Sequence, residues 1–140
     1  MNAQVDLLMD SLEIAAERHG DLVPLVYQRF YARYPQTRQM FGRDAGNLHQ
    51  GHMFNGMLNA VLEQARGCCH QGSIDAWVAD HALWGVEPAM FSVMFDALHD
   101  TLCDCLGPDW TPPVAAQWRG TIDVLAGRFD QACQATGLRR

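Results

Sequence analysis

The stretch of sequence that says most about the fold lies at residues 73–88 and reads SIDAWVADHALWGVEP. At the period of an α-helix, its apolar residues Ile74, Trp77 and Val78 fall on one face together with His81. Such a stripe is typical of a helix that packs one side against a protein core. We therefore expect a short helix that presents an imidazole ring to an apolar interior.

Residues that commonly begin and end helices flank this stretch. Ser73 has the side chain of an N-cap, and Gly85 is of the type that stops a helix in the left-handed conformation. Pro88 is favoured in the first turn of a following helix, where its missing N–H is not needed. The sequence thus predicts a helix from about Ser73, a tight turn, and a new helix at Pro88.

Two interpretations of His81 are open at this point. A neutral imidazole in an apolar, aromatic-lined space has the properties that an iron porphyrin needs in its axial ligand. A core histidine that donates to a backbone carbonyl is the simpler alternative, since buried polar groups are usually satisfied in that way. The rest of the chain has to decide between them.

Helical periodicity and turn residues continue along the whole chain, and no strand is predicted. The second helix is capped by Asp21 and ended by Pro35, after which a short turn reaches Phe41. The other expected helices, besides the one that carries His81, span residues 3–19, 47–66, 88–106 and 112–136. With no repeat or low-complexity linker, residues 1–140 are expected to form one all-α domain.

Composition narrows the class of protein further. Hydrophobic residues make up 49% and charged residues 19% of 140 residues, which suits a globular domain. A net charge of −6 argues against nucleic-acid binding. No apolar run is long enough to span a membrane, and the N-terminus lacks the features of a secretory signal. Five cysteines, with Cys68 and Cys69 adjacent, do not form a disulfide framework, so a cytoplasmic protein with reduced thiols is expected.

Three motifs in order along the chain carry a resemblance to a known family. They are VYQRFYARYP at residues 26–35 with RQMF at 38–41, HALWGVEP at 81–88, and LGPDWTP at 106–112. Together they resemble the globin family, in particular bacterial single-domain hemoglobins and the heme domain of flavohemoglobins. The resemblance extends from about Val5 to Phe129 and implies the globin fold, a three-over-three helical sandwich around a heme pocket.

The resemblance assigns a role to several residues around that pocket, among them those on the proximal side. It implies that His81 is the metal ligand, the axial residue of heme b (iron protoporphyrin IX), and that Phe41 wedges the porphyrin. Val86 and Phe91 match the turn and the aromatic residue that follow the ligand, while Trp77 either shapes the pocket or is plain packing. The candidates for contact with the heme propionates are Arg38, Arg43 and His52.

On the distal side, Tyr27 matches the tyrosine whose hydroxyl donates a hydrogen bond to the bound gas, unless it is an ordinary core tyrosine. The register that fits the family best makes Gln50 the distal polar residue and Phe54 the apolar residue above the ligand. A shift of one residue puts His49 there instead, and His52 is the third choice. All three alternatives for the distal polar residue stay open.

The chain departs from flavohemoglobins on the proximal side. Those proteins carry a tyrosine and a glutamate behind the axial histidine, whereas this chain has Phe91 and, near the glutamate position, Cys133. Polar partners behind an axial histidine make it more electron-donating. Their loss is expected to weaken the push that favours cleavage of an oxygen–oxygen bond.

The leading functional prediction is a heme protein that reversibly binds dioxygen, nitric oxide or carbon monoxide for storage, delivery or scavenging. The first alternative is a nitric oxide dioxygenase, which would need a separate reductase because the 140 residues contain no G-x-G-x-x-G nucleotide-binding motif. The second is a heme-based gas or redox sensor. A signalling module that keeps the globin shape without heme is the remaining alternative.

Overall fold

The computed structural model describes residues 3–41 and 48–137, apart from the side chains of residues 40, 41, 48 and 49, and within these ranges all regular structure is helical. The α-helices are α1 (Ala3–His19), α2 (Val23–Arg33), α3 (Leu48–Arg66), α4 (Gln71–Ala82), α5 (Pro88–Leu106) and α6 (Pro112–Ala135). Among the described residues, the 3₁₀ segments η1 (Pro35–Phe41) and η3 (Gly107–Asp109) lie between them. The all-α prediction is confirmed. None of the described helices is both long and apolar enough to span a membrane.

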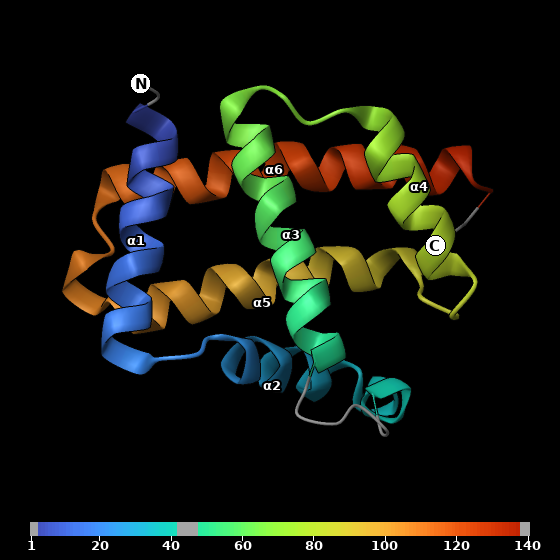
Figure 1. Cartoon of the computed structure of the whole chain (residues 1–140), viewed down its shortest axis with the longest axis horizontal. Helices are drawn as coiled ribbons and strands as arrows, with labels where there is room; N and C mark the ends of the chain where they lie inside the picture. The colour runs from blue at the N-terminus through green and yellow to red at the C-terminus, as the bar shows by residue number, and fades with distance from the viewer. Residues whose placement is uncertain (1–2, 42–47, 138–140) are drawn as a thin grey trace.

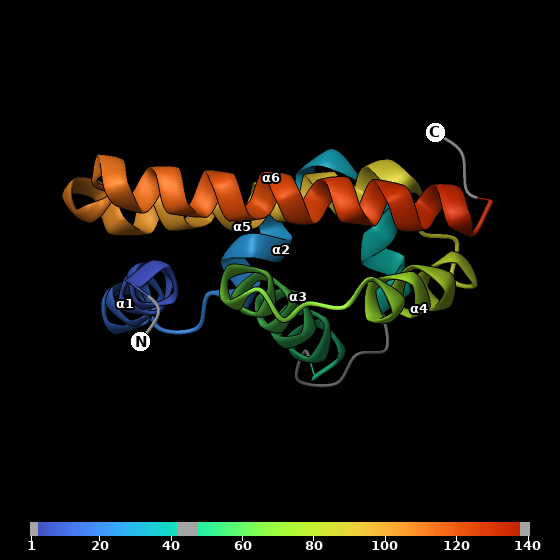
Figure 2. The ribbon, with the colours of Figure 1, turned by 90° about the horizontal axis from the view of Figure 1, so that it is seen from above.

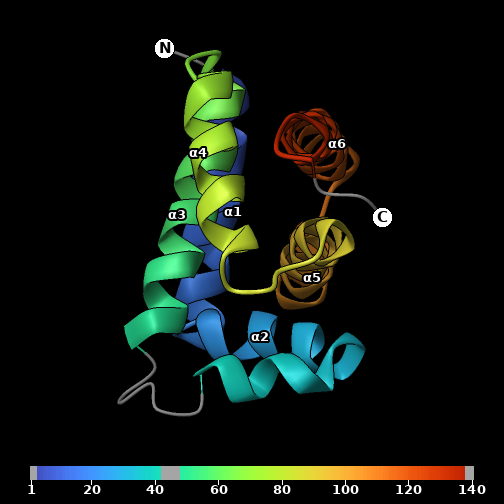
Figure 3. The same ribbon diagram turned by 90° about the vertical axis from the view of Figure 1, so that its right-hand side faces the viewer.

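The helices form two layers that cross at a steep angle. The long helices α5 and α6 run antiparallel and side by side, while α1, α3 and α4 cross in front of them (Figure 1). The view from above separates the two layers (Figure 2), and the end view shows α2 passing below them (Figure 3). Since α2 packs mainly on α5, the arrangement is the expected three-over-three sandwich: α1, α3 and α4 over α2, α5 and α6.

The start of α2 differs by one residue from the prediction: Leu22 holds the N-cap position, and Asp21, the predicted cap, precedes it. Asp21 accepts a hydrogen bond from the backbone N–H of Val23 at 3.0 Å, so its carboxylate satisfies one of the free donors of the first turn. Tyr34 ends the helix in a non-helical conformation, as expected for a residue that precedes a proline. Pro35 then begins η1. These local signals fix the direction in which the chain leaves α2.

The start of α4 differs from the prediction. The helix begins at Gln71, after an extended His70, and not at Ser73. The reason is a contact with α6: the Gln71 amide donates to the backbone carbonyl of Arg128 at 3.1 Å, and Arg128 donates back to Gln71 at 3.1 Å. The predicted N-cap at Ser73 is therefore wrong: the N-cap is His70, three residues earlier, because a tertiary contact extends the helix.

Trp118 of α6 lies at the centre of the core, fully buried. Its indole Nε1–H donates to Ser11 Oγ of α1 at 2.7 Å, and that hydroxyl donates in turn to the Leu8 carbonyl at 2.7 Å. Burying an indole is worth on the order of 4–6 kcal/mol from its area alone. The large aliphatic side chains buried with it are Leu8, Leu98, Leu102, Leu106, Ile122 and Leu125. This buried cluster holds α1 against α5 and α6.

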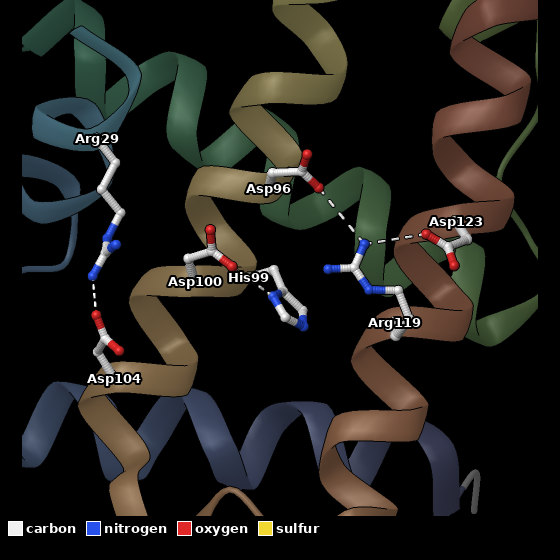
Figure 4. A network of polar contacts seen from close by, with 7 residues as sticks. All are labelled: Arg29, Asp96, His99, Asp100, Asp104, Arg119 and Asp123. Carbon is white, nitrogen blue, oxygen red and sulfur yellow. Dashed lines mark hydrogen bonds and ion pairs between the residues drawn. The ribbon is translucent and has the colours of Figure 1, made fainter. Parts of the chain in front are cut away.

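Charged residues join the helices on the outside (Figure 4). Arg29 of α2 pairs with Asp104 of α5, while Arg119 of α6 lies between Asp96 of α5 at 3.6 Å and Asp123 at 3.2 Å. All these side chains are exposed, and exposed ion pairs contribute at most about 1 kcal/mol each. The fold is therefore held by its apolar core and not by this network.

Candidate functional site

His81 lies in the last turn of α4, and its side chain is half-buried. Its Nδ1 is 2.8 Å from the backbone carbonyl oxygen of Trp77, one turn earlier in the same helix. Because a carbonyl can only accept, Nδ1 carries the proton, and Nε2 keeps a free lone pair. Burial lowers the pKa of the imidazole, against smaller opposing effects of the Trp77 hydrogen bond and the Asp80 carboxylate. The ring is thus held neutral, in the tautomer that a metal ligand needs.

Aromatic side chains hold this ring on two sides. The indole of Trp77 is stacked on it, with centroids 5.2 Å apart and planes 6° from parallel. Phe91 of α5 meets it edge-on at 5.7 Å and itself packs on Phe129 of α6 at 5.3 Å. Side chains of α4, α5 and α6 thereby fix the orientation of the imidazole.

The atom that faces Nε2 is the sulfur of Met53, at 3.3 Å. Met53 belongs to α3 and stands one residue before Phe54, whose side chain is in the core and only 6% exposed. Met53 was not among the site residues predicted from the sequence. It lies four residues after His49, so both residues fall on the same face of the helix. The alternative register, with His49 as the distal residue, was therefore the signal in the sequence for this position.

The polar residues of α2 and α3 meet at Tyr31, which was not among the site residues predicted from the sequence. The amide of Gln50 donates to the hydroxyl of Tyr31 at 2.7 Å, and the guanidinium of Arg38 lies 4.5 Å above the Tyr31 ring. Tyr27, one turn earlier, is 2% exposed and packs against Phe30 and Tyr31 at 6.4 and 5.7 Å. Tyr27 and Tyr31 are four residues apart and so lie on the same face of α2, and this spacing was the signal in the sequence for Tyr31.

The turn after His81 brings Val86 back beneath the helix. The N–H of Val86 donates to the His81 carbonyl at 3.2 Å, and Gly85 has φ 80°, which a residue with a side chain rarely adopts. Val86 is half-buried, whereas Trp84 is 75% exposed and so does not line the site.

Of the other residues predicted for the site, His52 is exposed. The side chains of Phe41 and His49, and all of Arg43, lie outside the described residues.

Trp77 also reaches across to α3, where Gly56 leaves room for it. A Cβ built on Gly56 would stand 2.1 Å from Cη2 and 2.4 Å from Cζ3 of the indole. Only glycine permits this approach, because non-bonded carbon atoms rest about 3.5–4.0 Å apart. A glycine inside a helix costs stability, so its presence was a signal for such a close contact.

The residues around Nε2 fit a porphyrin iron in their chemistry. A neutral, oriented imidazole lies among aromatic and thioether groups, as an axial ligand requires. Among the described residues, no group of three His, Cys, Asp or Glu side chains could hold a metal ion without a macrocycle. The Met53 sulfur and the Trp77 indole lie between α3 and α4, so both side chains have to shift to admit a flat macrocycle beside His81.

One comparison with known proteins bears on this arrangement. The family model for globins matches residues 25–129, three quarters of the chain. The matched part begins in α2 and includes α3, α4, α5 and most of α6. It therefore contains every described residue that surrounds the His81 ring.

Proposed function

This chain belongs to the globin family of heme proteins that bind gases such as dioxygen, and on that premise we propose that it binds heme b through His81 and reversibly binds dioxygen. The observation that carries the proposal is the hydrogen bond from Nδ1 of His81 to the Trp77 carbonyl. That bond fixes both the tautomer and the direction of Nε2. In the wider family, we place the chain with the bacterial single-domain hemoglobins.

On the proximal side, this chain's residues set how strongly the imidazole donates electrons. Heme, when bound, supplies the centre at which a diatomic gas binds and is released. The partner of His81 Nδ1 is a neutral backbone carbonyl, and the residue behind the ring is Phe91, which has no polar group. A neutral acceptor polarises an imidazole less than a carboxylate does. This proximal side favours reversible binding over cleavage of an oxygen–oxygen bond.

On the distal side, the proposal assigns hydrogen-bond donation to Tyr27 and to the Gln50–Tyr31 pair. Tyr27 is buried, so a polar gas beside it would meet a hydroxyl in an environment without competing water. A bond of this kind to a partly charged ligand contributes about 1.5–3 kcal/mol, which is roughly one to two decades in affinity. The bond from Gln50 to Tyr31 at 2.7 Å keeps the Gln50 amide directed toward α2.

The test begins with the full chain reconstituted with iron protoporphyrin IX. The wild-type chain should give a Soret band, and its ferrous form should change spectrum reversibly when oxygen is added and removed. His81→Gly should lose the band and regain it with added imidazole, because the free base restores the missing ligand. The exposed His70 provides the control, and His70→Ala should behave as wild type. A His81→Gly protein with an unchanged heme spectrum would contradict the proposal.

A second candidate is a nitric oxide dioxygenase supplied with electrons by a separate reductase. The observation in its favour is the paired tyrosine and glutamine, since the same donors that retain dioxygen would hold it for reaction with nitric oxide. The two candidates are separated by mixing the oxygenated protein with nitric oxide. Stoichiometric nitrate with reductase-supported turnover indicates the enzyme, whereas a single turnover followed by slow re-reduction indicates a carrier.

A further inference from the structure

The contact between His81 and Met53 joins two electron-pair donors. Nδ1 of His81 carries the ring's proton for the Trp77 carbonyl, so Nε2 has only a lone pair to offer. The thioether sulfur of Met53 also has lone pairs and no proton. The two atoms nevertheless face each other at 3.3 Å. They make no hydrogen bond with each other, and an acceptor of electron pairs between them would satisfy both.

We propose that Met53 is the second axial ligand of the heme iron when no gas is bound. The inference rests on the proposed binding of heme through His81. Imidazole and thioether together form one of the ligand pairs that proteins use for heme iron. Metal bonds to nitrogen and sulfur are about 2.0 and 2.3 Å long, so the two atoms must separate by roughly 1 Å. Methionine, unbranched with several rotatable bonds, accommodates that change.

The neighbours of Met53 on α3 are less suited to this role. Gln50 is held by its hydrogen bond to Tyr31. Phe54 has no donor atom and packs into the core, and His52 is exposed. Among the described side chains of α3, Met53 is the one with a ligating atom against Nε2. His49, whose side chain lies outside the described residues, is the rival that the experiment has to separate.

A ligated Met53 would make gas binding a competition. An incoming gas replaces the thioether, which leaves with its lone pair, and no electron is transferred in the exchange. If the thioether is bound about nine-tenths of the time, the apparent affinity for gas falls about tenfold. Methionine in place of an empty sixth position also raises the reduction potential of heme iron. Both effects are measurable without any assay of catalysis.

The experiment compares heme-loaded wild type, Met53→Leu and Met57→Leu. Leucine replaces methionine at nearly constant volume, so both variants should fold, and matching circular dichroism and unfolding curves verify this. Met57, one turn further along α3 and buried in the core, is the matched control. We expect a six-coordinate low-spin ferrous spectrum without gas in wild type and Met57→Leu, and a five-coordinate spectrum in Met53→Leu. Carbon monoxide should bind Met53→Leu about tenfold more tightly, and its reduction potential should fall.

The outcomes distinguish this inference from the function on which it rests. If wild type binds heme and Met53→Leu has the same spectrum and potential, the inference is overturned while heme binding through His81 stands. If His49→Ala and not Met53→Leu removes the sixth ligand, the inference is overturned in favour of that histidine. If the wild-type chain takes up no heme, the proposed function itself is wrong, and this inference with it.

Discussion

The indole of Trp77 lies on the backbone of Gly56, so that α4 touches α3 at the one position in this contact that has no side chain. The same indole is stacked on His81. A change at position 56 is thereby transmitted to the imidazole through a rigid ring. This relationship links the packing of two helices to the orientation of the candidate axial ligand.

Gly56→Ala is expected to destabilise the heme-free chain and to disturb His81. The new methyl would stand 2.1 Å from the indole, so Trp77 has to leave its place against α3. Overpacking of this kind costs about 1–3 kcal/mol, which exceeds the gain of about 0.5–1 kcal/mol from alanine in a helix. Chemical unfolding measures the loss, and tryptophan fluorescence reports the movement of Trp77.

Gly120 of α6 supplies the control for that substitution. Nothing lies within 4 Å of a Cβ built there, so Gly120→Ala should stabilise the chain by about 0.5–1 kcal/mol. Equal unfolding free energies for Gly56→Ala and Gly120→Ala would contradict the contact between Trp77 and α3.

Tyr27→Phe is expected to release oxygen roughly 10- to 100-fold faster than wild type, since the variant lacks the hydroxyl that we assign as donor. Stopped-flow displacement of oxygen from the ferrous heme-loaded protein measures the rate. Tyr31→Phe is the informative comparison, because it removes the acceptor of the Gln50 amide and leaves Tyr27 intact. A larger effect at Tyr31 than at Tyr27 would reverse their assigned roles.

Ser11→Ala should lower the free energy of unfolding by about 1–3 kcal/mol. The substitution leaves the buried Nε1–H of Trp118 without its acceptor, and a buried donor that loses its partner costs that amount. Ser73→Ala serves as the control: Ser73 is exposed in the first turn of α4 and is not its N-cap, so a change within about 0.5 kcal/mol is expected. A large loss at Ser73 would restore the N-cap that the sequence predicted.

The cysteines should differ in how their alkylation depends on pH. Burial raises the pKa of the Cys105 thiol, the Asp104 carboxylate raises it further, and Arg29 opposes them. Because only the thiolate reacts, a raised pKa keeps Cys105 protonated and slow near neutral pH, and its rate should increase only at more alkaline pH. Iodoacetamide pulses followed by peptide mass spectrometry should show the exposed Cys68 modified first. Modification of Cys105 as fast as Cys68 at neutral pH would count against this order.

On α3, the sequence did not single out the residue that contacts His81. Gln50 and Phe54 remain the predicted distal residues, and the structure adds Met53, whose sulfur lies against His81 Nε2. Residues 53 and 54 are both apolar, so periodicity alone does not say which one faces the neighbouring helix. A difference of one position rotates a helix by about 100°, which is enough to exchange a core residue for a site residue.

The sequence by itself determined the helices, most of their ends and the apolar face on which His81 stands, because these depend on residues within one or two turns of each other. Only the tertiary structure decided that Met53, 28 residues away, faces the imidazole, that Gln50 donates to Tyr31, and that Gly56 admits Trp77. Such pairings depend on how two helices cross and on which rotamer each side chain adopts, and neither is set by the local chain.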